Sequence, residues 1–261
     1  EYPDFDYNTY TFIANYAPYA QGDGMEHRNS TVLSSSGSIF YAGNRLIGTV
    51  AHEFMHAWNV ERLRPASLQP FFFDRANMSS SLWFAEGFTS YFTDLILCRV
   101  GIISQEQYLS EVQGIVNNVI TSPGHLYHGP VEMSQLAPFV DAAVHSDATS
   151  FYNTYISYYT YGAAIGLALD LSLRQSHSSS LDAYMKLLWL NFGKNEIPYT
   201  LQDLENSLAH LTDERFASGF FQEYIHGSNL PDFQTLLLGM GVKVKDSFGD
   251  QLFLADYRLT V

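Results

Sequence analysis

The sequence contains the stretch His52-Glu53-Phe54-Met55-His56. It lies within residues 44–60, where apolar residues recur with the period of a helix. Two histidines four residues apart on a helix are offset by about 40° around its axis and about 6 Å along it, so both imidazoles project from one face. Such a pair can bind one metal ion, and Glu53 is placed to take a proton from a water that the metal acidifies. The motif predicts a metal-dependent hydrolase, the alternative being a polar histidine pair on a helix surface.

A third metal ligand is expected at Glu86, thirty positions beyond His56 (86 − 56). Glu86 lies on a predicted helix, flanked by Trp83, Phe84 and Ala85. Carboxylates in apolar surroundings are rare unless they are paired or bound to metal. The alternative is a first-turn glutamate that interacts with the helix dipole. Two histidines and one glutamate leave a fourth position for water, which is typical of catalytic rather than structural zinc.

The pattern around these residues predicts an α+β protein with a small N-terminal sheet and a mainly helical body. Residues 7–17 predict a strand, 21–24 a glycine-rich turn, and 25–33 a second strand or edge segment. Residues 121–150, with scattered Gly, Pro and His, predict loops, and the alternating tail 242–261 predicts strands. Helices are expected over residues 44–60, 82–100, 104–119, 161–176, 180–192, 200–209 and 213–226.

Composition narrows the class of protein. The 261 residues are 46% hydrophobic and 15% charged, which excludes wholesale disorder. Asp and Glu exceed Lys and Arg by 27 to 13, so the basic surface of a nucleic-acid binder is missing. One cysteine, Cys98, excludes an internal disulfide framework. No apolar stretch reaches the roughly 18–20 residues of a membrane span, and no signal peptide is visible, which favours the cytoplasm.

The sequence resembles the gluzincin metallopeptidases, which carry His-Glu-x-x-His and a distant Glu on a second helix. Within them it is most similar to the glycyl aminopeptidase family, whose members often carry a C-terminal PDZ domain and which is related to the aminopeptidase N family. The resembling segments are residues 24–30 (GMEHRNS), residues 52–59 (HEFMHAWN) with Arg62 and Arg64-Pro65, residues 83–91 (WFAEGFTSY) and residues 157–162 (SYYTYG). The resemblance implies a thermolysin-like catalytic domain and one Zn²⁺ held by His52, His56 and Glu86.

Two further roles follow from this resemblance. Gly24-Met25-Glu26 is similar to the signature in which a glutamate binds the free α-amino group of the substrate, the alternative for Glu26 being a solvated carboxylate. Tyr159 matches the tyrosine of the family's Tyr-x-Lys-Gly, which donates a hydrogen bond to the oxyanion. Tyr161 stands where the family has Lys, and Tyr158 is the rival for the oxyanion role.

Relatives also tend to carry an acidic residue seven or eight positions after the ligand glutamate. Those positions here are Thr93 and Asp94, and a carboxylate there would orient a zinc-bound histidine. Eight residues rotate the side chain about 80° away from Glu86, so a surface aspartate on the helix is the alternative. Three histidines of the predicted loop region, His125, His128 and His145, fit no standard metal spacing and are interpreted as exposed.

The resemblance implies a catalytic domain over residues 1–240, with the sheet over about 1–43 and the helical body over about 44–240. Residues 241–261 would form a short β tail, and the family suggests an upstream β domain and a downstream PDZ domain. The implied function is a zinc aminopeptidase whose substrates are peptides with a free N-terminus, with a family preference for glycine or alanine. A zinc endopeptidase and a catalytically silent peptide-binding homologue are the alternatives.

Overall fold

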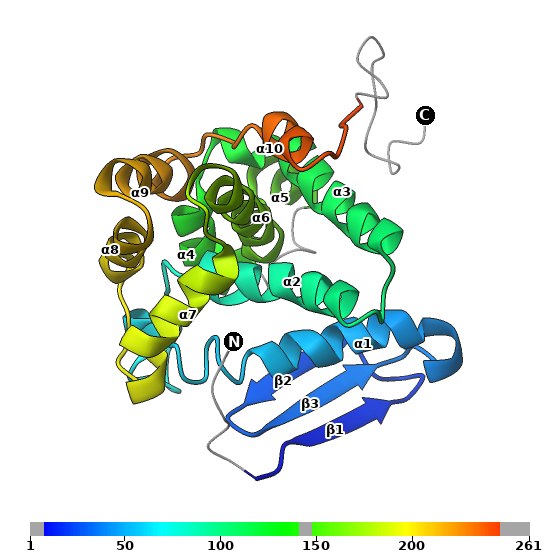
Figure 1. The fold of residues 1–261 in the computed structure, drawn as a ribbon. Helices are drawn as coiled ribbons and strands as arrows, with labels where there is room; N and C mark the ends of the chain where they lie inside the picture. Colours follow the sequence, from blue (N-terminus) through cyan, green and yellow to red (C-terminus); the bar gives the residue numbers. More distant parts are fainter. Residues whose placement is uncertain (1–7, 141–147, 246–261) are drawn as a thin grey trace.

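A small sheet stands at the N-terminal end of the molecule (Figure 1). The computed structural model describes residues 8–140 and 148–245. The sheet has the order β1-β3-β2, with β1 parallel and β2 antiparallel to β3. Its strands are β1 (Thr11–Tyr16), β2 (Asp23–His27) and β3 (Ser30–Ser35). The single strand predicted over residues 25–33 is wrong, because the polar pair Arg28-Asn29 turns the chain and divides it into two antiparallel strands.

Helix α1 (Ile39–Met55) lies along one face of the sheet (Figure 1). It begins five residues before the predicted start, because the Ser38 side chain accepts a hydrogen bond from the Phe40 N–H and caps the helix. It also ends earlier than predicted, and residues 56–62 continue as turns. His56 is the C-terminal cap and keeps a helical backbone conformation, with φ −61° and ψ −18°. The face shared by the two histidines is therefore preserved.

Helix α6 (Tyr158–Ser176) runs through the middle of the helical body and is buried on nearly all sides. A helix that is apolar all round belongs in a core, and α2, α3, α4, α7 and α10 pack against α6 (Figure 1). No helix in the described part of the chain has the length and hydropathy that crossing a membrane requires. The remaining helices are α2 (Leu82–Arg99), α3 (Gln105–Thr121), α4 (Pro130–Val140), α5 (Ala148–Thr154), α7 (Leu181–Asn191), α8 (Leu201–Leu211), α9 (Glu214–Phe220) and α10 (Phe233–Gly239), with short helical turns η1 (Ala66–Leu68), η2 (Pro123–Leu126), η3 (Gly193–Asn195) and η4 (Phe221–His226).

The prediction of loops over residues 121–150 is wrong, since η2, α4 and the start of α5 lie there. Pro130 is the first residue of α4, where the missing N–H of proline costs no hydrogen bond, so this proline starts a helix rather than breaking one. The predicted β tail falls largely on residues 246–261, which lie outside the described ranges. Residues 242–245 form no strand.

Helices α2 and α6 cross in backbone contact at Gly87 and Gly162. A Cβ atom on Gly87 would overlap the Gly162 backbone, and a Cβ on Gly162 would overlap the Trp83 carbonyl. Only glycine at both positions permits so close an approach. The crossing brings the first turn of α6, with Tyr159, next to the turn of α2 that carries Glu86. The α+β class with a small N-terminal sheet, predicted from the sequence, is confirmed.

Candidate active site

Three side chains from two helices converge where α1 ends. His52 Nε2 lies 3.2 Å from Glu86 Oε2, and His56 Nε2 lies 3.1 Å from the same oxygen. The two Nε2 atoms are 3.1 Å apart. Ligand atoms about 2.0–2.2 Å from a tetrahedral zinc ion stand roughly 3.3 Å from one another. The three side chains therefore have the chemistry and the spacing to hold a metal ion.

The electrostatics of this group also fit a cation. Burial lowers the pKa of His56, but the adjacent Glu86 carboxylate outweighs burial, so the pKa of His56 is raised. Burial raises the pKa of Glu86, yet His56 and His52 together lower it by more. Because the pKa of His56 is raised, its imidazole holds a proton that faces the Glu86 carboxylate. A metal cation would replace that proton.

Glu53 is buried beside the ligands, at 6% exposed. Burial raises the pKa of Glu53 to about 7, His56 lowers it, and the carboxylates of Glu26 and Glu86 add to the rise. Gly24 of β2 packs directly against this side chain, because a Cβ at position 24 would overlap the Glu53 carboxyl group. The absence of a side chain at Gly24 thus gives Glu53 its place.

Glu26 lies on β2, the edge strand next to Glu53. A carboxylate oxygen of Glu26, one of Glu53 and a ring nitrogen of His56 lie within 4.8 Å of one another. Glu26 is partly exposed, whereas Glu53 and His56 are buried. The hairpin of β2 and β3 is tied to the rest of the fold through buried Arg62, which donates to the carbonyls of Arg28 and Ala57. The structure therefore brings Glu26 to the mouth of the site.

Tyr159 lies in the first turn of α6, and its ring centroid is 5.9 Å from that of His52. Tyr159 is 39% exposed, while its rival Tyr158 is 6% exposed and belongs to the hydrophobic core. Of the two tyrosines, Tyr159 is the one that presents its ring to solvent beside the ligands. Tyr161, at the position where the resembling family has Lys, is fully buried, and burial raises its pKa above the ordinary value of a phenol.

The chain is similar to a known peptidase family and to a solved aminopeptidase-like structure. Residues 45–165 match the M61 glycyl aminopeptidase family. The matched range holds both histidines, Glu53, Glu86 and Tyr159. A solved structure, the aminopeptidase N family protein from Idiomarina loihiensis, is similar with a TM-score of 0.82 and 30% sequence identity, over 93% of this chain. The chain spans 42% of the length of that protein. No curated protein sequence matches significantly.

The resemblance to the glycyl aminopeptidase family that the sequence motifs indicated is thus confirmed. The M61 match ends before α7, whereas the structural similarity extends over nearly the whole chain. Glu26 precedes the matched range of residues 45–165. It lies on β2, which packs against helix α1 within that range.

Asp94 lies on α2, eight residues beyond Glu86. Burial, and then the nearby Glu111, raise the pKa of Asp94 to about 6. The Nδ1 atom of His56 has a different partner, the backbone carbonyl of Asn59 at 2.6 Å. The role of Asp94 in orienting a zinc-bound histidine therefore stays a prediction. The spacing of the His-Glu-x-x-His motif did not indicate that Asn59 lies at the site, and the structure shows that it does.

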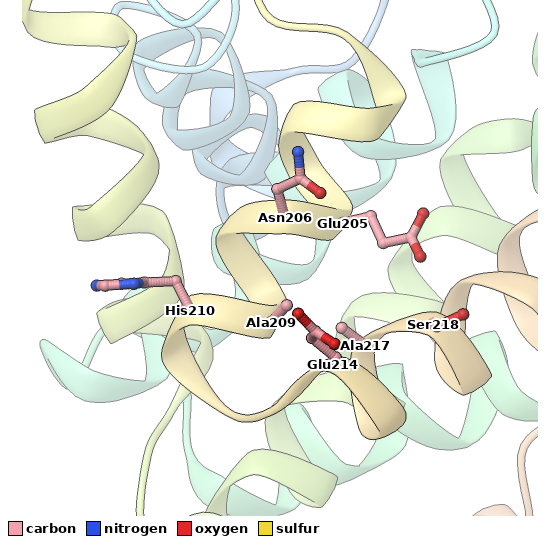
Figure 2. Close-up of a pocket in the computed structure, with 7 residues that line it drawn as sticks. All are labelled: Glu205, Asn206, Ala209, His210, Glu214, Ala217 and Ser218. Carbon is pink, nitrogen blue, oxygen red and sulfur yellow. The ribbon is translucent and has the colours of Figure 1, made fainter.

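Two of the predicted loop histidines and one cavity need a separate description. His128 pairs with Glu132 at 3.0 Å, and His145 lies outside the described residues. A cavity of about 500 Å³ lies between α8 and α9 and contains none of the predicted site residues. Its ionisable side chains, Glu205, His210 and Glu214, do not converge, and Glu205 and His210 extend to opposite sides in Figure 2. In the described ranges, the groups able to share a metal ion are both at the end of α1.

Proposed function

We propose that this chain carries the active site of a zinc-dependent aminopeptidase that removes the N-terminal residue of peptides. The observation that supports it best is the convergence of His52, His56 and Glu86, with buried Glu53 beside them and the Glu26 carboxylate within 4.8 Å of Glu53 and His56. The match to the M61 family supports the same reading. His52, His56 and Glu86 would hold one zinc ion per chain.

Zinc in such a site supplies a Lewis acid that polarises the scissile carbonyl and lowers the pKa of a water molecule. Glu53 would accept the proton of the attacking water and pass it to the leaving amine. Without a bound cation the pKa of Glu53 is raised to about 7, and the charge of a zinc ion would lower it from there, so the carboxylate would be ionised and able to accept a proton near neutral pH. Burial, the largest cause of that raised pKa, also keeps bulk water away from the carboxylate.

Tyr159 would donate its phenolic hydrogen bond to the oxyanion that forms on the substrate carbonyl. Its partial exposure leaves it accessible to a substrate, and its ring lies against that of His52. A donor that is already in place when charge develops lowers the barrier by a few kcal/mol in comparable sites.

Glu26 would bind the substrate's free α-ammonium group. It stands on the edge strand of the sheet, with its carboxylate near Glu53 and His56. A peptide whose N-terminus pairs with Glu26 would therefore have its first peptide bond close to the proposed base. A charge-assisted hydrogen bond to an ammonium contributes roughly 1.5–3 kcal/mol. Glu26 therefore supports an exopeptidase over the endopeptidase alternative.

Two measurements test the proposal. The first is zinc content by elemental analysis, which should give one zinc per wild-type chain and little in His56→Ala, because three protein ligands leave no spare. Full zinc in His56→Ala would contradict the ligand assignment.

The second is a paired assay on an aminoacyl reporter and its N-acetylated counterpart. Wild type should cleave the free-amine reporter far better, and Glu26→Ala should lose about 10–150-fold in kcat/KM on it, the rate equivalent of roughly 1.5–3 kcal/mol. Equal cleavage of both reporters by wild type would favour the endopeptidase, and a zinc-loaded wild type that cleaves neither would favour the silent peptide-binding homologue.

A further inference from the structure

Asn59 connects the two helices that supply the proposed metal ligands. It follows His56 by three residues, in the turns that succeed α1, and it is completely buried. Its backbone carbonyl and its side-chain amide make contacts in two different directions.

The carbonyl contact depends on where α1 ends. In a continuous helix, the carbonyl of Asn59 would accept the N–H of residue 63. Here the N–H of Leu63 donates instead to the carbonyl of Trp58, so the Asn59 carbonyl is available to His56 Nδ1, 2.6 Å away. A carbonyl only accepts hydrogen bonds, so Nδ1 carries a proton, and Nε2 is the nitrogen that faces Glu86 and is left to bind a metal ion.

The side-chain contact is made to α2. Asn59 Nδ2 donates to the carbonyls of Phe84 and Ala85, at 3.3 and 3.1 Å, and to Thr89 Oγ1 at 3.2 Å. Two of these three neighbours can only accept, which fixes the amide nitrogen as the atom that faces them. Ala85 immediately precedes Glu86, so the amide holds the turn of α2 that carries the third ligand.

We propose that Asn59 is a positioning residue that sets His56 and Glu86 at the spacing a metal ion needs. The inference rests on the proposed zinc site and adds a residue that contacts neither substrate nor metal. Partners that orient metal ligands in this way typically contribute 10–100-fold to metal affinity. Asn59 would do so for two ligands at once, through its carbonyl for His56 and through its amide for Glu86.

The test compares Asn59→Ala and Asn59→Asp with a matched control, Ser134→Ala. The aspartate nearly preserves the volume of Asn59 but places acceptor oxygens against the carbonyls of Phe84 and Ala85. Ser134 is as buried as Asn59, and its hydroxyl accepts from the Trp83 N–H, so it also bonds the first turn of α2 without contacting a ligand. The measurements are the zinc dissociation constant by chelator competition, the visible spectrum of the cobalt-substituted protein, and the thermal stability of each metal-free variant.

Both Asn59 variants should bind zinc about 10–100-fold more weakly and shift the cobalt spectrum, whereas Ser134→Ala should lose stability but keep the wild-type zinc affinity and spectrum. Variants at Asn59 that lose stability yet bind zinc within threefold of wild type, with an unchanged cobalt spectrum, would show that Asn59 is only structural. Should neither variant fold, Thr89→Val removes one of the three acceptors, and an unchanged zinc affinity there would also refute the proposal. A wild-type protein that binds no zinc contradicts the proposed site itself, which is a separate result.

Discussion

Substitution of Gly24 by alanine should impair catalysis without removing the metal. A Cβ built on Gly24 lies 2.8 Å from Cγ and 2.5 Å from Cδ of Glu53, whereas ordinary contacts are 3.4 Å or longer. The Glu53 side chain or β2 must therefore move by about 0.6 Å at Cγ (3.4 − 2.8) and about 0.9 Å at Cδ (3.4 − 2.5). A misplacement of about 1 Å can cost roughly 100-fold in rate, so we expect kcat of Gly24→Ala to fall about 10–100-fold.

The assay is steady-state turnover of an aminoacyl reporter by zinc-loaded protein, with zinc content and thermal stability measured on the same samples. Zinc should stay at the wild-type level, because the overlap involves Glu53 and none of the three ligands. Gly22→Ala is the matched control, since a Cβ at Gly22 has no atom within 4 Å. Neither glycine has a positive φ, so backbone strain does not distinguish them. If Gly24→Ala turns over as fast as Gly22→Ala, packing against Gly24 does not determine the position of the base.

Three further predictions concern single side chains. Glu53→Gln should keep zinc and fold but lose about 10²–10⁴-fold in kcat, because an amide cannot accept the proton, and near wild-type turnover of the zinc-loaded variant would exclude Glu53 as the base. Tyr159→Phe should lower kcat with little change in KM, while a silent Tyr159→Phe together with an impaired Tyr158→Phe would transfer the oxyanion role to the buried neighbour. Burial, and then Glu111, raise the pKa of Asp94 in the folded protein from 3.8 to about 6. Between about pH 4 and 6 the folded protein therefore binds more protons than the unfolded chain, and the free energy of unfolding falls as pH rises through that range. Asp94→Asn should therefore raise the free energy of unfolding at pH 7 by about 1–2 kcal/mol and change it little below about pH 4, as measured by urea denaturation, whereas a 10–100-fold loss of zinc affinity in this variant would instead support its role in orienting a histidine.

The convergence of the metal-ligating side chains could be predicted from sequence because its constraints are local. Four residues separate His52 from His56, and helix geometry alone then places both imidazoles on one face. Glu86 was recognisable as a carboxylate among aromatic residues on a second helix. The boundaries of α1 could not be predicted so well, since its start depends on the Ser38 cap and its end on the turns over residues 56–62.

Contacts between distant segments were beyond such reasoning. The packing of Gly24 against Glu53 depends on how β2 pairs with β3 and how the sheet lies on α1, and neither is encoded in a short window. The helix α4 was missed because Pro130 suggested a loop, although proline is favoured at a first helical position. The contact of Asn59 with Phe84 of α2 likewise joins residues that are 25 positions apart in the sequence.

The contact of Gly87 with Gly162 fixes the distance between helices α2 and α6 independently of the side chains around them. Where a layer of side chains separates two helices, each exchange of one apolar residue for another alters the spacing of the helices slightly. Between Gly87 and Gly162 no such layer exists, and the backbones themselves define how far apart the helices lie. We therefore expect exchanges of core residues in the outer helices to leave the separation of Glu86 and Tyr159 nearly unchanged.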